Sequence, residues 1–366
     1  MTVAISETAQ VQAHWPLLAV TPGDPCGIGP EIVARAWQTA PALMQGCFVA
    51  GDVALMRRAQ GLLGSRVDLP VCVIEQPAEA LTVPPGCLPV LQVVTPVDLP
   101  HWGQVDPVAG RMAGEAVLWV TRAALRAEID GLVTAPLHKE ALHAAGAPWN
   151  QYPGHTELLQ AEAARHHGLS LAEMPVRMML ASPELRTVLV SIHVSLRQAL
   201  EAITREQVLQ TLLITHHSLT RLLGHAPRIA VAGVNPHAGE GGLFGHEEIE
   251  ILAPAIEAAR QQGLQVDGPL APDTVFMRAR HTKDKAGEFD VVVAMYHDQG
   301  LIPVKYLGVE QGVNVTLGLP IVRTSPDHGT AMDIAGQGKA DATSLLQAVR
   351  MAKTLALPKR TAGVQP

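Results

Sequence analysis

Cysteine is scarce in this chain of 366 residues: there are only four, all in the first quarter, and none forms a Cys-x-x-Cys pair. Disulfide-stabilised scaffolds are short and rich in cysteine, and cysteine-based zinc sites need closely spaced thiols. The sequence therefore fits neither class. We expect reduced thiols in a cytoplasmic protein.

Long apolar runs are missing as well, because no stretch approaches the roughly 20 residues that a helix needs to cross a bilayer. The first basic residue is Arg35, so the early positive charge of a targeting peptide is absent. Basic residues are not in excess either: 27 lysines and arginines face 34 acidic residues, for a formal net charge of −7. Because nucleic-acid binding needs a basic surface, we expect neither a nucleic-acid nor a membrane partner.

What the chain does contain is a hydrophobic share of 48% with charges of both signs, which excludes general disorder. The length predicts two domains. Short apolar runs alternate with segments of helical periodicity. We expect strands at 17–21, 47–50, 132–135, 178–181, 187–192, 229–234 and 291–295, and helices at 53–63, 109–128, 206–223, 247–262 and 342–355.

This alternation predicts an α/β layered fold with mostly parallel central strands, in which functional groups gather on loops at the carboxyl ends of the strands. The turn at 182–184 predicts a hairpin between its two flanking strands. Residues 1–14 are patternless, which indicates a loose tail. Residues 66–106 hold seven prolines and predict an irregular or strand-rich region.

The glycine-rich turn at 23–29 superficially matches a dinucleotide-binding fingerprint. The match fails because the pattern needs a small residue at position 32, which is Ile32. Asp52, after the second strand, could imitate a ribose-binding acid or cap the next helix. A tight turn whose amides face a cleft is the better interpretation, and an anion could still bind there.

Three of the sixteen histidines stand just after predicted strands: His193, His237 and His297. Neutral imidazoles on such loops suit zinc and related divalent metals, and three of them leave positions open for substrate. Asp298 could orient the ring of His297. The alternative for each histidine alone is an ordinary polar group, and the spacings carry no local metal-binding signature.

Anion-binding groups are also present. His155 and Thr156 open a predicted helix, where Thr156 could act as the cap and free amides could bind an anion. Lys305, Asn314 and Arg323 follow the third histidine. Arginine can hold a phosphate or carboxylate through two parallel bonds, and the apolar run before Arg323 favours a cleft position. Lys139 is more ambiguous, with a solvated helix-surface charge as its default interpretation.

At these residues the chain resembles the 4-hydroxythreonine-4-phosphate dehydrogenase family of pyridoxal-phosphate biosynthesis, from about Leu17 to Leu355. The segments that carry the resemblance are TPGDPCGIGPE at 21–31, GHTE at 154–157, NPHAGE at 235–240, YHDQG at 296–300, GVNVTLGLP at 312–320 and RTS at 323–325.

The resemblance implies two α/β/α domains of the isocitrate/isopropylmalate-dehydrogenase type. The first comprises approximately 15–145 with 310–358, and the second 146–309. It implies a homodimer whose active site lies in the interdomain cleft at the subunit interface. It also implies one divalent metal (zinc, magnesium or cobalt) on His193, His237 and His297, with at least one ligand from the partner subunit.

The resemblance further implies substrate contacts from His155, Thr156, Lys305, Asn314 and Arg323. The segment 327–336 is similar to the nicotinamide-cofactor loop of isopropylmalate dehydrogenases, which implies cofactor contacts from His328, Gly329, Thr330 and Asp333. NAD is the expected cofactor, with NADP as a possibility. Lys305 and Asp298 are the candidate acid–base residues, with water as the alternative proton acceptor.

The implied reaction is the metal-assisted oxidation and decarboxylation of 4-phosphohydroxy-L-threonine to 3-amino-2-oxopropyl phosphate. Residues 136–159 look closer to a paralogous branch that oxidises 4-phospho-D-threonate or D-erythronate, so a sugar-acid phosphate is the alternative substrate. A metal-dependent phosphate hydrolase and a non-enzymatic metabolite-binding protein are the remaining hypotheses.

Overall fold

The computed structural model describes residues 15–64 and 69–361. The predicted tail at 1–14 and positions 66–68 of the proline-rich segment lie outside the described residues. No helix in the described part is long and apolar enough to cross a membrane.

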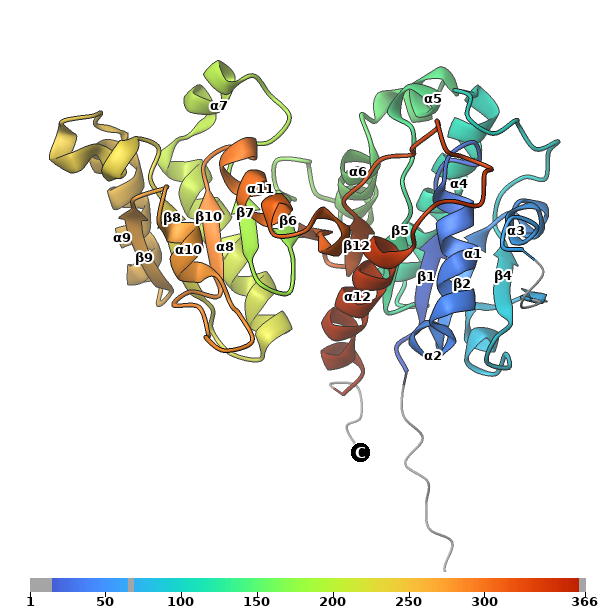
Figure 1. The fold of residues 1–366 in the computed structure, drawn as a ribbon. Helices are drawn as coiled ribbons and strands as arrows, with labels where there is room; N and C mark the ends of the chain where they lie inside the picture. The colour runs from blue at the N-terminus through green and yellow to red at the C-terminus, as the bar shows by residue number, and fades with distance from the viewer. Residues whose placement is uncertain (1–14, 65–68, 362–366) are drawn as a thin grey trace, which may run out of the picture.

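One twelve-stranded sheet runs through the whole protein and joins the two lobes seen in Figure 1. Its strand order is β3-β4-β2-β1-β5-β12-β11-β6-β7-β10-β8-β9. The strands are β1 Leu18–Thr21, β2 Cys47–Gly51, β3 Val71–Ile74, β4 Leu88–Gln92, β5 Gly131–Thr134, β6 Arg177–Ala181, β7 Arg186–Leu189, β8 Arg228–Ala232, β9 Gln265–Leu270, β10 Val291–Ala294, β11 Val313–Leu317 and β12 Arg323–Pro326.

Pairing is parallel in both outer parts of the sheet and antiparallel at its centre. β12 is parallel to β5, whereas β11 is antiparallel to both β12 and β6, and β6 is antiparallel to β7. The β6–β7 pair is the hairpin predicted around 182–184. The expectation of mostly parallel strands is therefore confirmed, with an exception at this junction, where β11 returns from the second lobe and enters the sheet between β12 and β6.

Helices cover both faces of the sheet. They are α1 Gly29–Thr39, α2 Pro41–Met44, α3 Val53–Gln60, α4 Pro107–Leu125, α5 Lys139–Ala144, α6 His155–His167, α7 Leu196–Ala202, α8 Arg205–Leu223, α9 Ala253–Gln261, α10 Val275–Ala279, α11 His297–Tyr306 and α12 Thr343–Thr361. Helical turns occupy Pro77–Leu81, Trp149–Gln151, Pro236–Gly242, Glu248–Leu252 and Val309–Gln311.

Alternating side chains of β1 enter two different cores, which explains why this strand is apolar throughout. Leu18 and Val20 pack in the core that includes residues of α1, α8, α9 and α12. Leu17 and Ala19 pack in the core that includes residues of α4 and α6. A strand covered by helices on both faces needs a continuous apolar run rather than an alternating one.

Several local predictions are confirmed. Asp52 caps α3, since its Oδ1 accepts a hydrogen bond of 2.7 Å from the Leu55 amide, and its Oδ2 accepts one from Gln92. Both oxygens are thus used structurally within the described residues. Helix α8 ends at Gly224, which adopts the left-handed conformation. Helix α6 packs against α4. The domain boundaries expected from the sequence stay a prediction.

Candidate active site

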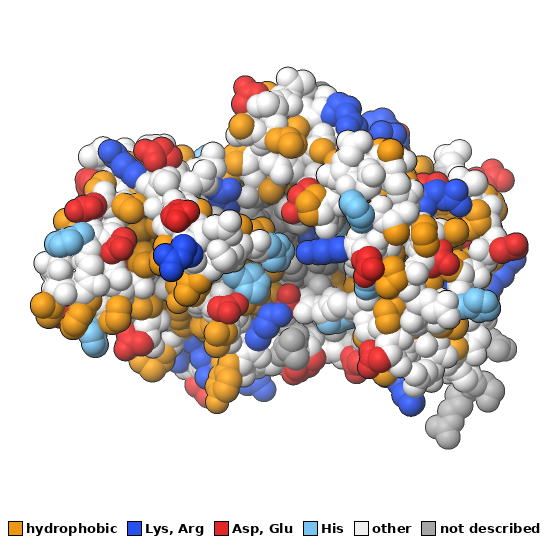
Figure 2. Space-filling view, turned by 90° about the horizontal axis from the view of Figure 1, so that it is seen from above, with side chains coloured by type: hydrophobic (Ala, Val, Ile, Leu, Met, Phe, Trp, Pro, Cys, Tyr) orange, Lys and Arg blue, Asp and Glu red, His pale blue; other side chains and the backbone are white. Residues whose placement is uncertain are grey.

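A cavity of about 340 Å³ lies where β5, β12, β11 and β6 meet the start of α6. Seen from above, the molecule is hollowed between its lobes, and histidine side chains meet lysine or arginine side chains at this hollow (Figure 2). The predicted residues that line the cavity are His155, Thr156, His193, Asn314, Arg323, His328 and Gly329. Residues far apart in the chain therefore share one cavity.

Arg323 lies in the wall of the cavity and is only 4% exposed. Its guanidinium donates to the hydroxyl of Thr134 at 2.9 and 3.2 Å and to that of Thr316 at 3.1 Å. Within the described residues it forms no ion pair with a carboxylate, and burial lowers its pKa to about 10. A buried cation held only by hydroxyls is costly unless an anion joins it, so the cavity is suited to an anionic ligand.

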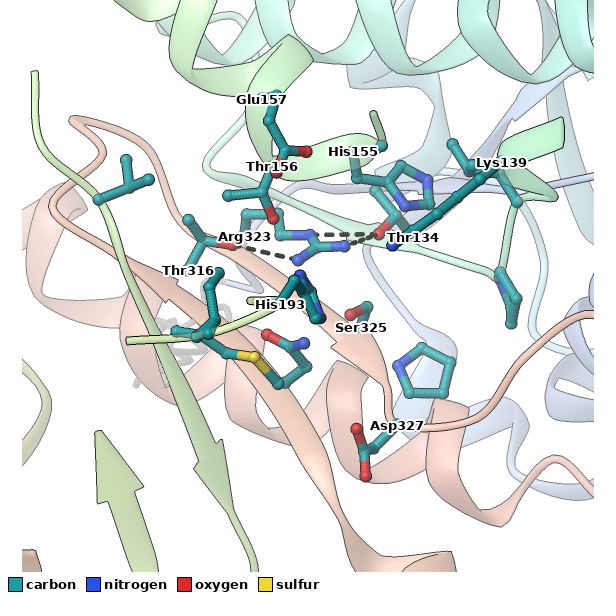
Figure 3. A pocket seen from close by; sticks show the side chains of 18 of the residues that line it. Thr134, Lys139, His155, Thr156, Glu157, His193, Thr316, Arg323, Ser325 and Asp327 are labelled. Carbon is teal, nitrogen blue, oxygen red and sulfur yellow. Dashed lines mark hydrogen bonds between the residues drawn. The ribbon is translucent and has the colours of Figure 1, made fainter. Parts of the chain in front are cut away.

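His155 and the start of α6 stand above Arg323 (Figure 3). The imidazole Nε2 of His155 is shielded from solvent and has no hydrogen-bond partner in the described structure. Burial, with Arg323 and Lys139 nearby, holds the pKa of His155 well below its usual value. Gly154 is the N-cap of α6, with no side-chain cap, so the expectation that Thr156 caps this helix is wrong. Thr156 instead lines the cavity in the first helical turn.

His193 and His297 come together at the edge of this cavity, with ring centroids 5.7 Å apart. His193 follows β7, and His297 is the first residue of α11 after β10; β7 and β10 are paired in parallel. The Nδ1 atom of His297 lies 2.6 Å from Oδ1 of Asp298. This contact fixes the ring and directs its Nε2 away from Asp298, which is the arrangement expected of an imidazole ligand.

His237 does not join these two histidines within one chain. No group of three or more His, Cys, Asp or Glu side chains able to hold a metal occurs among residues 15–64 and 69–361. His237 is exposed on the turn Pro236–Gly242, and the ring nearest to it is that of Phe244, at 6.1 Å between centroids. The turn is strained: His237, Ala238 and Glu240 all have positive φ.

Buried Glu248 holds this strained turn in place. Its Oε1 accepts from the amides of Val234 and Asn235 at 2.7 and 2.8 Å, and its Oε2 accepts from the side-chain amide of Asn235 at 2.9 Å. Strain maintained by a dedicated buried carboxylate is typical of functional loops. The imidazoles present are therefore of the right type for a divalent metal. Two of them are already adjacent, and the third is held on a separate, exposed turn.

The predicted lysine, Lys305, is paired with a residue of the cavity wall but does not line the cavity itself. Nζ of Lys305 forms an ion pair of 2.9 Å with Oδ2 of Asp327, and Lys305 is not among the residues lining the cavity. Asp327 itself does line it. The role of Lys305 as a substrate or acid–base residue stays a prediction, as does the acid–base role of Asp298.

The predicted cofactor loop packs on the glycine-rich turn after β1. The Ile28 amide donates to the carbonyl of Thr330 at 2.9 Å, and a Cβ on Gly27 would lie only 2.9 Å from Cβ of Thr330. The glycines of this turn thus permit close packing of the 327–336 loop. His328 and Gly329 reach the cavity, whereas Asp333 does not line it.

Sequence reasoning assigned no role to Thr134, Glu157, Thr316 and Asp327, which line the cavity, and it left Lys139 ambiguous. A signal existed for Lys139, because it closely follows the predicted strand at 132–135, and loops after parallel strands gather functional groups. Thr134 and Arg323 are separated by 189 residues, so only the β5–β12 pairing reveals their contact.

The structure is an α/β protein in which a cavity with a buried arginine that has no carboxylate partner in the described chain lies beside two neighbouring imidazoles. The family model of the pyridoxal phosphate biosynthetic protein PdxA matches residues 44–352. The chain belongs to this family. Its named relatives are dehydrogenases, which makes them oxidoreductases.

Two curated relatives carry different names. The 4-hydroxythreonine-4-phosphate dehydrogenase of Beijerinckia indica subsp. indica is 48% identical over 342 residues, which cover 93% of this chain and 95% of the relative. The D-threonate 4-phosphate dehydrogenase of Salmonella typhimurium is 44% identical over 345 residues, covering 93% and 98%.

Solved structures share the fold. A 4-hydroxythreonine-4-phosphate dehydrogenase from Klebsiella pneumoniae superposes with a TM-score of 0.81 at 40% identity, covering 94% of this chain and 99% of that one. A terephthalate 1,2-cis-dihydrodiol dehydrogenase from Burkholderia xenovorans LB400 gives a TM-score of 0.62 at 29% identity, covering 93% and 98%.

Proposed function

We propose that this protein is an NAD-dependent, divalent-metal-assisted dehydrogenase that converts 4-phosphohydroxy-L-threonine to 3-amino-2-oxopropyl phosphate. The observation that carries the proposal is the buried Arg323, which has no carboxylate partner among the described residues, in the same cavity as His193. An anion-binding group and a candidate metal-binding group on one small cavity suit a phosphorylated hydroxy acid.

The chain's own residues bind and orient this substrate. Arg323 holds the phosphate, and Thr134 and Thr316 fix the plane of its guanidinium. The amides at the start of α6 and the hydroxyl of Thr156 add uncharged donors on the same side. Asn314, on β11, also lines the cavity.

His193, His237 and His297 would hold the divalent metal. When bound, the metal acidifies the substrate hydroxyl for hydride release and stabilises negative charge during loss of CO₂. Asp298 keeps the ring of His297 oriented through the 2.6 Å contact. Zinc, magnesium and cobalt all suit this role, and zinc matches the imidazole donors best.

The proposed nicotinamide cofactor would contact His328 and Gly329. Both residues line the substrate cavity, so a cofactor bound to their loop would lie next to the substrate. Thr330 and Asp333 belong to the same loop and are proposed to contact the cofactor. NAD is the proposed hydride acceptor, with NADP as the variant. Lys305 and Asp298 are the proposed acid–base residues.

We further propose a homodimer that completes the metal site. His237 is exposed and remote from the other two histidines within one chain. Both histidine-bearing segments also expose large apolar side chains, namely Val194, Leu196, Leu200, Leu243 and Phe244. A second copy that covers these side chains would bring His237 to the His193–His297 pair of its partner.

A second substrate has specific support. A relative 44% identical to this chain is named for D-threonate 4-phosphate. The same chemistry would apply, with a hydroxyl in place of the amine at carbon 2. This alternative shares the phosphate and the secondary hydroxyl, so the cavity described above accepts either compound.

The reaction class is tested by incubating the purified protein with substrate, metal and NAD while both NADH absorbance and free phosphate are followed. The proposal predicts NADH formation that a chelator abolishes, with no phosphate release. Phosphate release without NADH would support a hydrolase instead, and absence of both, with retained binding, would support a metabolite-binding protein.

A further inference from the structure

The charged residues lining the cavity divide into those that already have partners and those that do not. The guanidinium of Arg177 donates to Thr211, Gln207, Gln210 and a backbone carbonyl. Asp327 is paired with Lys305. Arg323, Lys139 and Glu157 remain without an ion pair among the described residues.

Lys139 stands at the mouth of the cavity, as the first residue of α5. Its side chain extends toward Arg323 and His155 in Figure 3. A Cβ placed on Gly154, the N-cap of α6, would lie 3.5 Å from Oε2 of Glu157 and 3.6 Å from Cε of Lys139. Burial, Arg323 and Lys139 together lower the pKa of His155, so the charge of Lys139 acts at this end of the cavity. An exposed lysine is free to extend into solvent, yet this one lies over the anion cavity.

The backbone that carries Lys139 is held rigidly. The Asp24 amide donates to the carbonyl of Pro136 at 2.9 Å, and a Cβ on Gly23 would lie 2.2 Å from that same oxygen. The buried carboxylate of Asp24 accepts from the Cys26 amide at 2.8 Å. Burial raises the pKa of Asp24, and hydrogen bonds from the backbone of Cys26 and His138 act in the opposite direction. The segment from β5 to α5 is therefore fixed before any ligand binds.

A phosphate monoester near neutral pH carries more negative charge than Arg323 alone can balance. Lys305, the second cation expected from the sequence, does not line the cavity and is paired with Asp327, which does. Lys139 is the remaining lysine that lines the cavity, and His155, whose buried Nε2 has no hydrogen-bond partner among the described residues, lines it as well. Glu157 is the one lining carboxylate left without an ion pair in the described chain, and no hydrogen bond joins it to Lys139.

We propose that Lys139 is the second cation of the phosphate subsite: it binds the substrate phosphate together with Arg323 and makes the site specific for phosphorylated hydroxy acids. This rests on the proposed function for the identity of the substrate, but not for the binding of phosphate itself. Lys139 is a binding residue that touches the phosphate and has no part in the redox step.

The test compares Lys139→Met with the wild-type protein and with Lys283→Met, which removes an exposed lysine outside the cavity. Binding of inorganic phosphate is measured by calorimetry on the full chain, without cofactor. Loss of one charge-assisted contact predicts phosphate binding weakened by about 10- to 100-fold in Lys139→Met and unchanged in Lys283→Met. Lys139→Arg should recover most of the affinity, and thermal unfolding in phosphate-free buffer should be unchanged in all three variants.

The second arm measures KM for 4-phosphohydroxy-L-threonine and for its unphosphorylated counterpart. Lys139→Met should raise KM for the phosphorylated compound alone and leave kcat within about 3-fold, because uniform binding is lost. Wild-type affinity for phosphate in Lys139→Met, or an equal effect on both compounds, would overturn the proposal. If the wild type binds phosphate through Lys139 but forms no NADH, the proposed function fails while the assignment of Lys139 stands.

Discussion

The imidazole rings of His193 and His297 lie side by side, with centroids 5.7 Å apart and planes tilted by 44°, and His193 lines the anion cavity. The β7–β10 pairing alone creates this proximity, since each histidine follows one of the two parallel strands. His237 follows β8, the next strand outward, and remains apart on its own strained turn. One chain thus supplies two adjacent candidate ligands and one remote candidate ligand.

This separation predicts complementation between mutant subunits. His193→Ala and His237→Ala proteins should each be inactive. In a mixed dimer, one site would lose both ligands and the other would keep all of them. Refolding an equal mixture should therefore restore roughly a quarter of wild-type activity, because half of the dimers are mixed and one of their two sites is intact. An inactive mixture whose mass confirms mixed dimers would contradict a shared site.

The burial of Arg323 without a carboxylate partner among the described residues predicts that this residue serves binding at the expense of stability. Arg323→Met should abolish phosphate binding, yet its free energy of unfolding in phosphate-free buffer should not fall, and should rise by up to about 2 kcal/mol. The reason is that a buried guanidinium without a carboxylate partner is removed. Denaturant unfolding with and without phosphate provides the measurement.

The matched control is Arg228→Met, because Arg228 donates to both oxygens of the nearly buried Asp290 at 2.9 and 3.1 Å. The free energy of unfolding of this variant should fall by about 1–3 kcal/mol, since the substitution leaves the Asp290 carboxylate with fewer partners. Equal destabilisation of the two variants would mean that Arg323 is paired in solution.

His155 predicts a pH dependence of stability. Burial lowers the pKa of His155 in the folded protein, whereas the unfolded chain takes up a proton near pH 6.5. The unfolded state is therefore favoured as the pH falls through about 6.5, and above about pH 7 His155 has no effect. Urea unfolding of metal-free protein between about pH 5 and 8 should show that the free energy of unfolding falls more steeply with decreasing pH in the wild type than in His155→Gln. Parallel curves would contradict the prediction.

Gly23 predicts a steric effect separate from backbone conformation. Gly23 and Gly86 both have positive φ, at +70° and +86°. A Cβ on Gly23 would meet the Pro136 carbonyl oxygen at 2.2 Å, whereas one on Gly86 meets nothing within 4 Å. Gly23→Ala should lower the free energy of unfolding by about 3 kcal/mol or more, and Gly86→Ala by about 1 kcal/mol, as measured by denaturant unfolding. Similar costs would show that the β1 turn relaxes freely.

Much of the fold could be predicted from the sequence because its signals are local. The apolar runs of β1, β5 and β10 and the cap at Asp52 depend on neighbouring residues alone. The β6–β7 hairpin could be predicted, but the two antiparallel pairings of β11 could not, because the position of β11 between β12 and β6 depends on the path of the chain between the lobes.

The site divides in the same way. Arg323 and the three histidines could be selected from the sequence because they lie next to apolar strand patterns. Lys139 does not, because an exposed charge at a helix start is ordinary until Arg323 and His155 are known to lie near it. The pairing of Lys305 with Asp327 is equally invisible in the sequence, since it joins α11 to the end of β12.

The most direct test of the account is a side-by-side measurement of kcat/KM for NADH formation from 4-phosphohydroxy-L-threonine and from 4-phospho-D-threonate, with the divalent metal present. The account predicts metal-dependent NADH formation with both compounds and the larger value for 4-phosphohydroxy-L-threonine. A larger value for the threonate would reassign the substrate, and no NADH from either compound would contradict the proposed dehydrogenase.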